Sequence, residues 1–146
     1  MSLAKEFPYQ YHLEVVFRDL DAMGHVNNAV YFTYLETARL RYLKELLSLP
    51  DLLQIPVIMA EATCSYKSPA FYGENLVIGL GISRFGTKSF VMTYQVETDR
   101  GRVVATAQTV QVMYDYAAGQ TIPVPDWFKE QVAVRQGNWQ PGTPTR

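Results

Sequence analysis

Hydrophobic and polar residues alternate along the first part of the chain and again along most of its second half. Residues 11–18 (YHLEVVFR) place Val15 and Phe17 on one apolar face, which predicts a strand. Residues 19–28 (DLDAMGHVNN) are rich in Asp, Gly and Asn, which favour turns, so this segment is predicted to be a loop.

The segment from Ala29 to Leu49 contains neither Gly nor Pro, and Pro50 supplies a stop. It therefore predicts a helix of about 20 residues. Asn27 or Asn28 is expected to cap its start. At about 100° per residue, one narrow polar stripe leaves most of the helix circumference apolar. Such a helix is expected to be enclosed on most sides.

Alternation of period two returns after residue 55 in four segments. They are residues 57–67, 76–82, 90–96 and 102–114. Because the connections between them are short, these segments are predicted to run antiparallel as a four-strand meander. A long apolar helix combined with one curved antiparallel sheet indicates an α+β architecture in which the sheet wraps around the helix.

The length of 146 residues is typical of one domain, so residues 1–146 are interpreted as a single unit. Its core is expected at about 11–116, with a short C-terminal helix at about 125–135 and a frayed tail at 137–146. One sheet layer cannot cover both the outside of the helix and its own edge, so a homodimer is expected.

Composition excludes several classes of function. The formal net charge of -1, from 13 Lys and Arg against 14 Asp and Glu, provides no field to hold nucleic acid or an anionic membrane. No apolar run approaches the roughly 20 residues that cross a bilayer, and the N-terminus lacks the features of a secretory signal. The protein is therefore expected to be cytoplasmic, without nucleic-acid or membrane partners.

Three side chains outside the loop have reactive groups. Cys64 is the single cysteine of the chain, which excludes an intrachain disulfide. It lies among small apolar residues on one face of a predicted strand, which favours a packed thiol over a nucleophile. Glu36 would suit a second active-site carboxylate, but Arg39 follows three residues later on the same helix face. A buried structural ion pair between Glu36 and Arg39 is the favoured interpretation.

The densest cluster of functional groups lies in the predicted loop: Asp19, Asp21, His25, Asn27 and Asn28. A calcium loop of the EF-hand type would need oxygen ligands at its fifth and twelfth positions, where Met23 and Val30 stand. A metal site from Asp21, His25 and His12 has only two ligands close in sequence, so no metal and no cofactor are predicted. Taken alone, the loop favours Asx residues that only shape the turn.

The enclosed helix changes this interpretation. The first N–H groups of a helix lack intrahelical acceptors and can hold an oxyanion. A carboxylate beside them would place a base next to an anion hole, which is the pairing that acyl-transfer chemistry needs.

The segment FRDLDAMGHVNNAVYFTYLETARLRYL resembles the signature of the hotdog-fold acyl-CoA thioesterases, the 4-hydroxybenzoyl-CoA thioesterase-like group. The shared features are D-x-x-G-H-V-N-N-x-x-Y at 21–31, E-x-A-R at 36–39, Ser68-Pro69-Ala70 and Gly73, within about residues 11–116. The resemblance implies a hotdog fold, a curved antiparallel sheet around one central helix, and hydrolysis of acyl-CoA to free acid and CoA.

The resemblance also implies catalytic roles for three residues. Asp21 matches the catalytic carboxylate, as base or nucleophile, and His25 matches the histidine next to the thioester. The backbone N–H of Asn28 matches the group that polarises the thioester carbonyl. Plant acyl-ACP thioesterases have a similar element, but with Asn where this chain has Met23.

The expected partner is an acyl-CoA substrate, bound by a homodimer or by a tetramer built as a dimer of dimers. Substrate contacts are expected from Asn27, Tyr31 and Phe32, near the helix start. Arg84 and Lys88, near strand ends, are expected to meet the CoA phosphates. Two alternatives remain: an acyl-ACP thioesterase and a noncatalytic acyl-binding module on the same fold. Hydratases of the same fold have a different arrangement of Asp and His, which this sequence does not contain.

Overall fold

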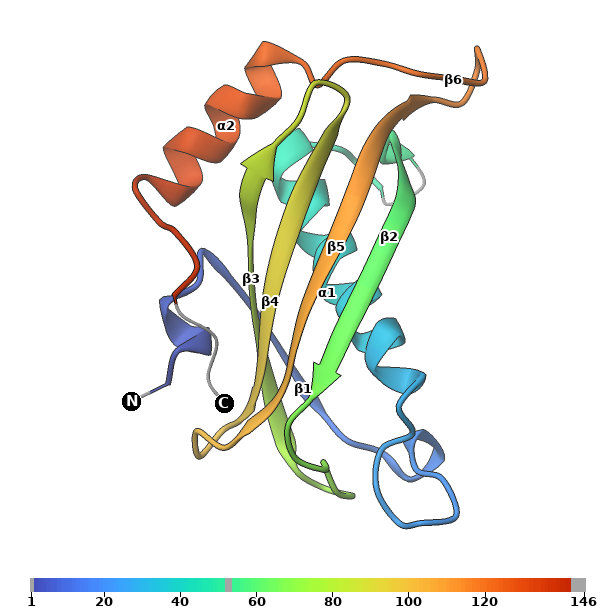
Figure 1. The fold of residues 1–146 in the computed structure, drawn as a ribbon, viewed down its shortest axis with the longest axis vertical. Helices are drawn as coiled ribbons and strands as arrows, with labels where there is room; N and C mark the ends of the chain where they lie inside the picture. Colours follow the sequence, from blue (N-terminus) through green and yellow to red (C-terminus); the bar gives the residue numbers. More distant parts are fainter. Residues whose placement is uncertain (1, 52–53, 143–146) are drawn as a thin grey trace.

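The computed structural model describes residues 2–51 and 54–142, in which a six-stranded antiparallel sheet curls around a long helix (Figure 1). The strands are β1 (Tyr9–Glu14), β2 (Val57–Tyr66), β3 (Asn75–Phe85), β4 (Ser89–Thr98), β5 (Val103–Asp115) and β6 (Gln120–Thr121). The helices are α1 (Val30–Leu47), α2 (Asp126–Gln136) and the short 3-10 helices η1 (Ala4–Glu6) and η2 (Phe17–Asp19). The predicted α+β architecture with a wrapped central helix is confirmed.

Helix α1 lies in the concave face of the sheet because apolar side chains cover most of its circumference. Leu35, Ala38 and Leu43 are almost completely buried there. The helix falls within the predicted 29–49 and ends where Ser48 takes a left-handed conformation, with φ of 54°. Packing on the sheet therefore fixes the helix along its length.

The predicted caps of α1 are wrong. Ala29 occupies the N-cap position, and no side chain caps it. The Asn27 side chain instead accepts the Ala29 N–H at 2.9 Å and closes a turn just before the helix. Asn favours helix caps and such turns for the same reason, a side-chain oxygen that accepts nearby N–H groups, so composition alone does not separate them.

The first strand is shorter than predicted, because β1 ends at Glu14. Val15 remains buried, but Val16 N–H then donates to the Asp19 carboxylate at 3.2 Å and the chain turns into η2. Phe17, predicted on the inner face, is consequently 78% exposed.

The order of strands in the sheet is β1-β3-β4-β5-β2, with β6 beside β5, so the predicted four-strand meander is wrong for one strand. All pairs are antiparallel, as expected. However, β2 pairs with β5 rather than with β3, and residues 67–74 cross the end of the sheet between them. This connection bonds to the end of the first strand instead of forming a hairpin: Val15 N–H donates to Glu74 O at 2.9 Å, and Gly73 N–H to Val15 O at 3.0 Å.

Strand β2 forms one edge of the sheet, and within the described part of the chain β5 is its only neighbour. Its side chains are mostly exposed, including Ile58 at 43% and Met59 at 39%. Apolar side chains on an unpaired edge strand are unusual in a monomer.

The predicted buried pair of Glu36 and Arg39 is also wrong. Arg39 is buried, at 8% exposure, and its Nη1 donates to the Tyr94 hydroxyl at 3.3 Å. Glu36 is exposed. Helical spacing brought the two residues onto neighbouring positions, but the sheet offered Arg39 a hydroxyl partner that the sequence does not reveal.

The segment before β1 and the segment after α2 pack together on the outer face of the sheet (Figure 1). The Ala4 N–H donates to the buried carboxylate of Glu97 at 3.0 Å. In the segment predicted to be a frayed tail, the Trp139 ring lies 5.0 Å from that of Phe7. The expectation for residues 143–146 lies outside the described residues.

No helix in the described ranges has both the length and the apolar character that a membrane crossing requires.

Candidate active site

The loop that leads into α1 is closed by an isolated bridge between Leu20 and Val26. Inside it, the Asp21 N–H donates to His25 O at 3.1 Å, and the Gly24 N–H donates to Asp21 O at 3.0 Å. Gly24 has φ of 85°, a conformation that other residues rarely adopt. The loop is therefore a hydrogen-bonded tight turn with Asp21 at its beginning.

The two aspartates of the loop have different partners. The Asp19 carboxylate accepts the Tyr34 hydroxyl at 2.7 Å and also the Val16 N–H. Burial, reinforced by this hydrogen bond, raises the pKa of Tyr34, so its hydroxyl remains a donor. Asp21 Oδ1 accepts the Met23 N–H at 2.9 Å, and its second oxygen accepts nothing from the described residues. Asp19 therefore holds the loop to the helix, whereas Asp21 has an oxygen available for chemistry.

Asp21 lines a pocket of about 490 Å³, within the range of small-molecule sites. The loop contributes one wall, the start of α1 another, and the end of β2 with the following connection the third. The lining residues are Asp21, Met23, His25, Val26, Asn28, Tyr31, Tyr66, Lys67, Ser68 and Pro69. The pocket thus brings together the three residues expected to be catalytic, Asp21, His25 and Asn28.

The Asn28 N–H faces no acceptor among the described residues. The Ala29 N–H that follows is taken by the Asn27 side chain. The Asn28 carbonyl accepts the Tyr66 hydroxyl at 2.8 Å, which fixes this peptide from the β2 side. Asn28 directly precedes the N-cap of α1, so its unpaired N–H lies beside the positive end of the helix and is a ready donor to an anionic oxygen.

His25 belongs to the loop and lines the pocket. Its Nδ1 is 3.3 Å from the Val26 carbonyl. Because a carbonyl oxygen only accepts, this contact requires the proton on Nδ1, and Nε2 of the neutral ring is then an acceptor. His25 can therefore orient a water molecule or a substrate donor.

The residues expected to bind substrate are only partly in the pocket. Tyr31 lines it and is buried; burial, the largest effect, raises the pKa of Tyr31 to about 12, so its hydroxyl stays protonated. Phe32 and Asn27 lie outside the lining. Arg84 and Lys88 sit near the β3–β4 hairpin, at the opposite end of the sheet from the loop (Figure 1).

Sequence reasoning missed Lys67, Tyr66 and Met23 as pocket residues. Lys67 is the only lysine or arginine in the lining formed by the described residues. The available signal was its position directly before Ser68-Pro69, part of the motif. The end of β2 and the loop are far apart in the sequence and line one pocket only in the folded chain, so local sequence patterns could not predict that they do.

Cys64 lies on β2, outside the lining and partly buried. Burial raises the pKa of its thiol, so it is held in the less reactive neutral form. Within the ranges that the structure describes, no three His, Cys, Asp or Glu side chains are grouped to hold a metal ion.

Residues 15–132 match the family described as the thioesterase-like superfamily. A thioesterase from Thermus thermophilus, in a crystal structure with coenzyme A and Zn, superposes with a TM-score of 0.84 at 31% identity, over 92% of this chain and 98% of that one. A gentisyl-coenzyme A thioesterase superposes with a TM-score of 0.74 at 27% identity, over 85% and 99%. A putative acyl-CoA thioesterase of Bacillus subtilis is 25% identical over 79% of this chain and 88% of its own. The predicted hotdog fold is confirmed by these superpositions.

The different partners of the two loop aspartates predict different effects on stability. Asp19→Ala should lower the free energy of unfolding by about 1–3 kcal/mol, because it leaves the Tyr34 hydroxyl without its acceptor. Asp21→Ala removes the same atoms and charge but should change it by about 0.5 kcal/mol or less. Urea unfolding of both variants measures the difference, and equal losses would contradict the structural assignment of Asp19.

Proposed function

Because the chain belongs to the thioesterase-like superfamily, we propose that it is an acyl-CoA thioesterase, which hydrolyses an acyl-CoA thioester to the free acid and CoA. One observation carries this proposal: Asp21 and Asn28 line the same pocket, and within the described residues a carboxylate oxygen of Asp21 and the N–H of Asn28 have no hydrogen-bond partner. Hydrolysis of a thioester needs both groups, an attacking or activating carboxylate and a donor for the oxyanion.

In the proposed reaction, the thioester carbonyl oxygen points at the Asn28 N–H. Asp21 removes a proton from a water molecule while the oxygen of that water adds to the carbonyl carbon. The tetrahedral oxyanion then collapses, the carbon–sulfur bond breaks, and the CoA thiolate takes the proton from Asp21. In the covalent variant, the Asp21 carboxylate itself adds to the carbon, CoA leaves, and water hydrolyses the resulting anhydride.

The expected contributions are large enough for a modest hydrolase. One oxyanion donor typically supplies about 2.7–4 kcal/mol of transition-state stabilisation, and a positioned base roughly 10²–10⁴ in rate. Thiolate is a good leaving group, so a strong general acid is not needed. His25 then serves to place water or substrate rather than to protonate sulfur.

The carrier is proposed to be CoA because relatives are named as CoA thioesterases and one related structure holds coenzyme A. Tyr31, Tyr66 and Pro69 give the pocket an aromatic and apolar wall that suits the acyl group. An acyl-ACP thioesterase and a noncatalytic acyl-binding module are the alternatives. A free carboxylate next to an anionic ligand disfavours the binding module.

Asp21→Asn should retain the fold and the turn, since Asn also accepts the Met23 N–H, but turnover should fall about 10²–10⁴-fold. The turnover of His25→Ala should fall less than that of Asp21→Asn. The measurement is thiol release with aromatic and aliphatic acyl-CoAs and acyl-ACPs. Asp99→Asn, an exposed aspartate outside the pocket, is the matched control. Near-parental turnover by Asp21→Asn would refute its role, and tight acyl-CoA binding by an inactive parent would favour the binding module.

Lys67 and Lys88 are competing candidates for the cation that meets the CoA phosphates. Only Lys67 lines the pocket of this chain. Lys67→Met should therefore raise KM for an acyl-CoA several-fold but not for the N-acetylcysteamine thioester of the same acid, which has no phosphates. Lys88→Met should change neither. The reverse pattern would favour Lys88, the residue expected from sequence.

We also propose a homodimer in which the free edges of β2 meet. An apolar edge strand with one neighbour is a surface that self-association covers, and β2 ends at the pocket wall through Tyr66. Sedimentation equilibrium should give about 33 kDa, twice the 16.6 kDa chain. A mass twice as large would indicate the dimer of dimers, whereas an active 16.6 kDa species would contradict the dimer.

A further inference from the structure

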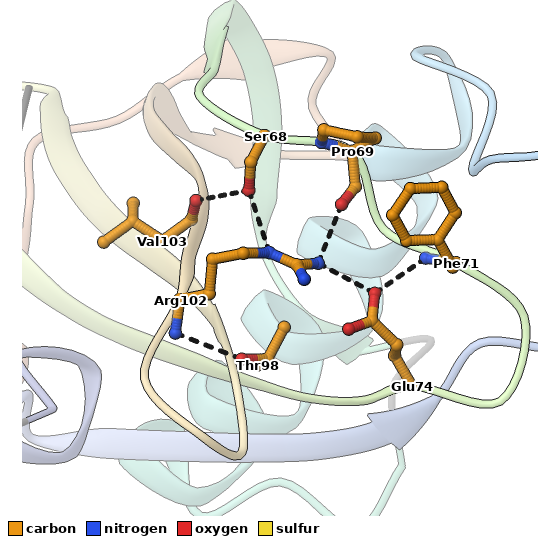
Figure 2. Close-up of polar contacts among 7 residues, drawn as sticks. All are labelled: Ser68, Pro69, Phe71, Glu74, Thr98, Arg102 and Val103. Atoms are coloured by element: carbon orange, nitrogen blue, oxygen red, sulfur yellow. Dashed lines mark hydrogen bonds and ion pairs between the residues drawn. The ribbon is translucent and has the colours of Figure 1, made fainter.

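The third wall of the pocket is held by a side chain that does not line it. Arg102, directly before β5, reaches across the connection between β2 and β3 (Figure 2). Its Nε donates to Ser68 Oγ at 3.2 Å, and its Nη2 donates to both Pro69 O and Glu74 Oε1 at 2.8 Å. The same Glu74 oxygen accepts the Phe71 N–H at 2.8 Å. Arg102 and Glu74 thus clamp the connection from both ends, and this pair is called the brace.

The brace encloses Ala70, which contacts the catalytic loop. The Ala70 carbonyl accepts the Val26 N–H at 2.9 Å, and Ala70 itself is fully buried. Val26 directly follows His25 and comes two residues before Asn28. The position of the Ala70 carbonyl therefore sets where the chain from His25 to Asn28 lies.

We propose that Arg102 and Glu74 are positioning residues, which hold His25 and the Asn28 N–H in reactive geometry through the Ala70 carbonyl. This inference rests on the proposed thioesterase function of the same pocket. Neither side chain lines the pocket, so their effect on catalysis is indirect.

The chemistry of the pair suits a fixed geometry. A guanidinium group offers several donors in one plane, which a lysine ammonium cannot reproduce toward three acceptors at once. Burial raises the pKa of Glu74, but the Arg102 and Phe71 hydrogen bonds and the Arg102 charge outweigh it and hold the pKa below its usual range. Glu74 is therefore an anion at neutral pH and keeps both of its donors.

The brace is also separable from folding. The side chains of Arg102 and Glu74 are 43% and 26% exposed. Ion pairs at such exposure contribute little to overall stability. Loss of the brace should therefore loosen the connection while the sheet and α1 remain folded.

Arg102→Met should lower kcat about tenfold while KM changes less than about threefold, because the transition state is more sensitive than substrate binding to misplaced groups. The matched control is Arg100→Met. Arg100 is exposed on the same β4–β5 turn, and its side chain makes no hydrogen bond or ion pair with described residues, so kcat should be unchanged. Arg102→Lys keeps the charge but loses the planar donors and should restore kcat only in part.

Amide hydrogen exchange at Val26 tests the brace without relying on activity. Exchange should be faster in Arg102→Met and in Glu74→Gln than in the parent, and unchanged in Arg100→Met. A parent chain inactive on every thioester would refute the proposed function, and Val26 exchange would still show whether the brace holds the loop.

Equal kcat in Arg102→Met and Arg100→Met would overturn the proposal, as would equal Val26 exchange. Full rescue by Arg102→Lys would also overturn it, since charge alone would then suffice. If Arg102→Met fails to fold, Glu74→Gln serves in its place, because Gln retains an acceptor for the Phe71 N–H and loses only the charge.

Discussion

The enclosure of α1 by the curved sheet is the constraint on which the candidate site depends. Leu35, Ala38 and Leu43 are buried against the sheet, so the helix has one position and its first turn meets the loop at one place. There the Asn28 N–H has no acceptor among the described residues, and Asn28 lines the same pocket as Asp21. An unpaired donor at a helix start is strongest where water is displaced, as a bound acyl group would displace it.

Three hydrogen-bonded ties hold this arrangement in place. Asp19 ties the loop to α1 through the Tyr34 hydroxyl, and Tyr66 ties the Asn28 carbonyl to the end of β2. The connection after β2 adds a third tie through Ala70 and Val26. These bonds come from segments far apart in the sequence, so the reactive groups are fixed by the fold rather than by the loop alone.

Local patterns predicted the helix, most strand segments and the polar loop before the helix, because periodicity and loop composition depend on neighbouring residues. The resemblance to a known family then singled out Asp21, His25 and Asn28 within that loop. Local patterns failed where distant partners decide. The predicted strand at 57–67 pairs with β5 rather than with its neighbour in sequence. Arg39 donates to the Tyr94 hydroxyl rather than pairing with Glu36. The position of Lys67, the cation in the pocket lining, also depends on contacts between distant segments. Lys67 shares the pocket with the loop only because β2 ends beside it, whereas Arg84 lies near the end of β3, outside the lining.

The most direct measurement is the amide NMR spectrum of the protein with an acyl-CoA analogue in which a methylene replaces the thioester sulfur. The carbonyl of this ketone cannot be cleaved but retains its shape and its acceptor oxygen. We expect a downfield shift of the Asn28 amide proton larger than that of any other amide, because only this N–H is proposed to donate to the carbonyl. Saturable binding that leaves the amides of residues 21–31 unperturbed would contradict the proposed role of the Asn28 N–H.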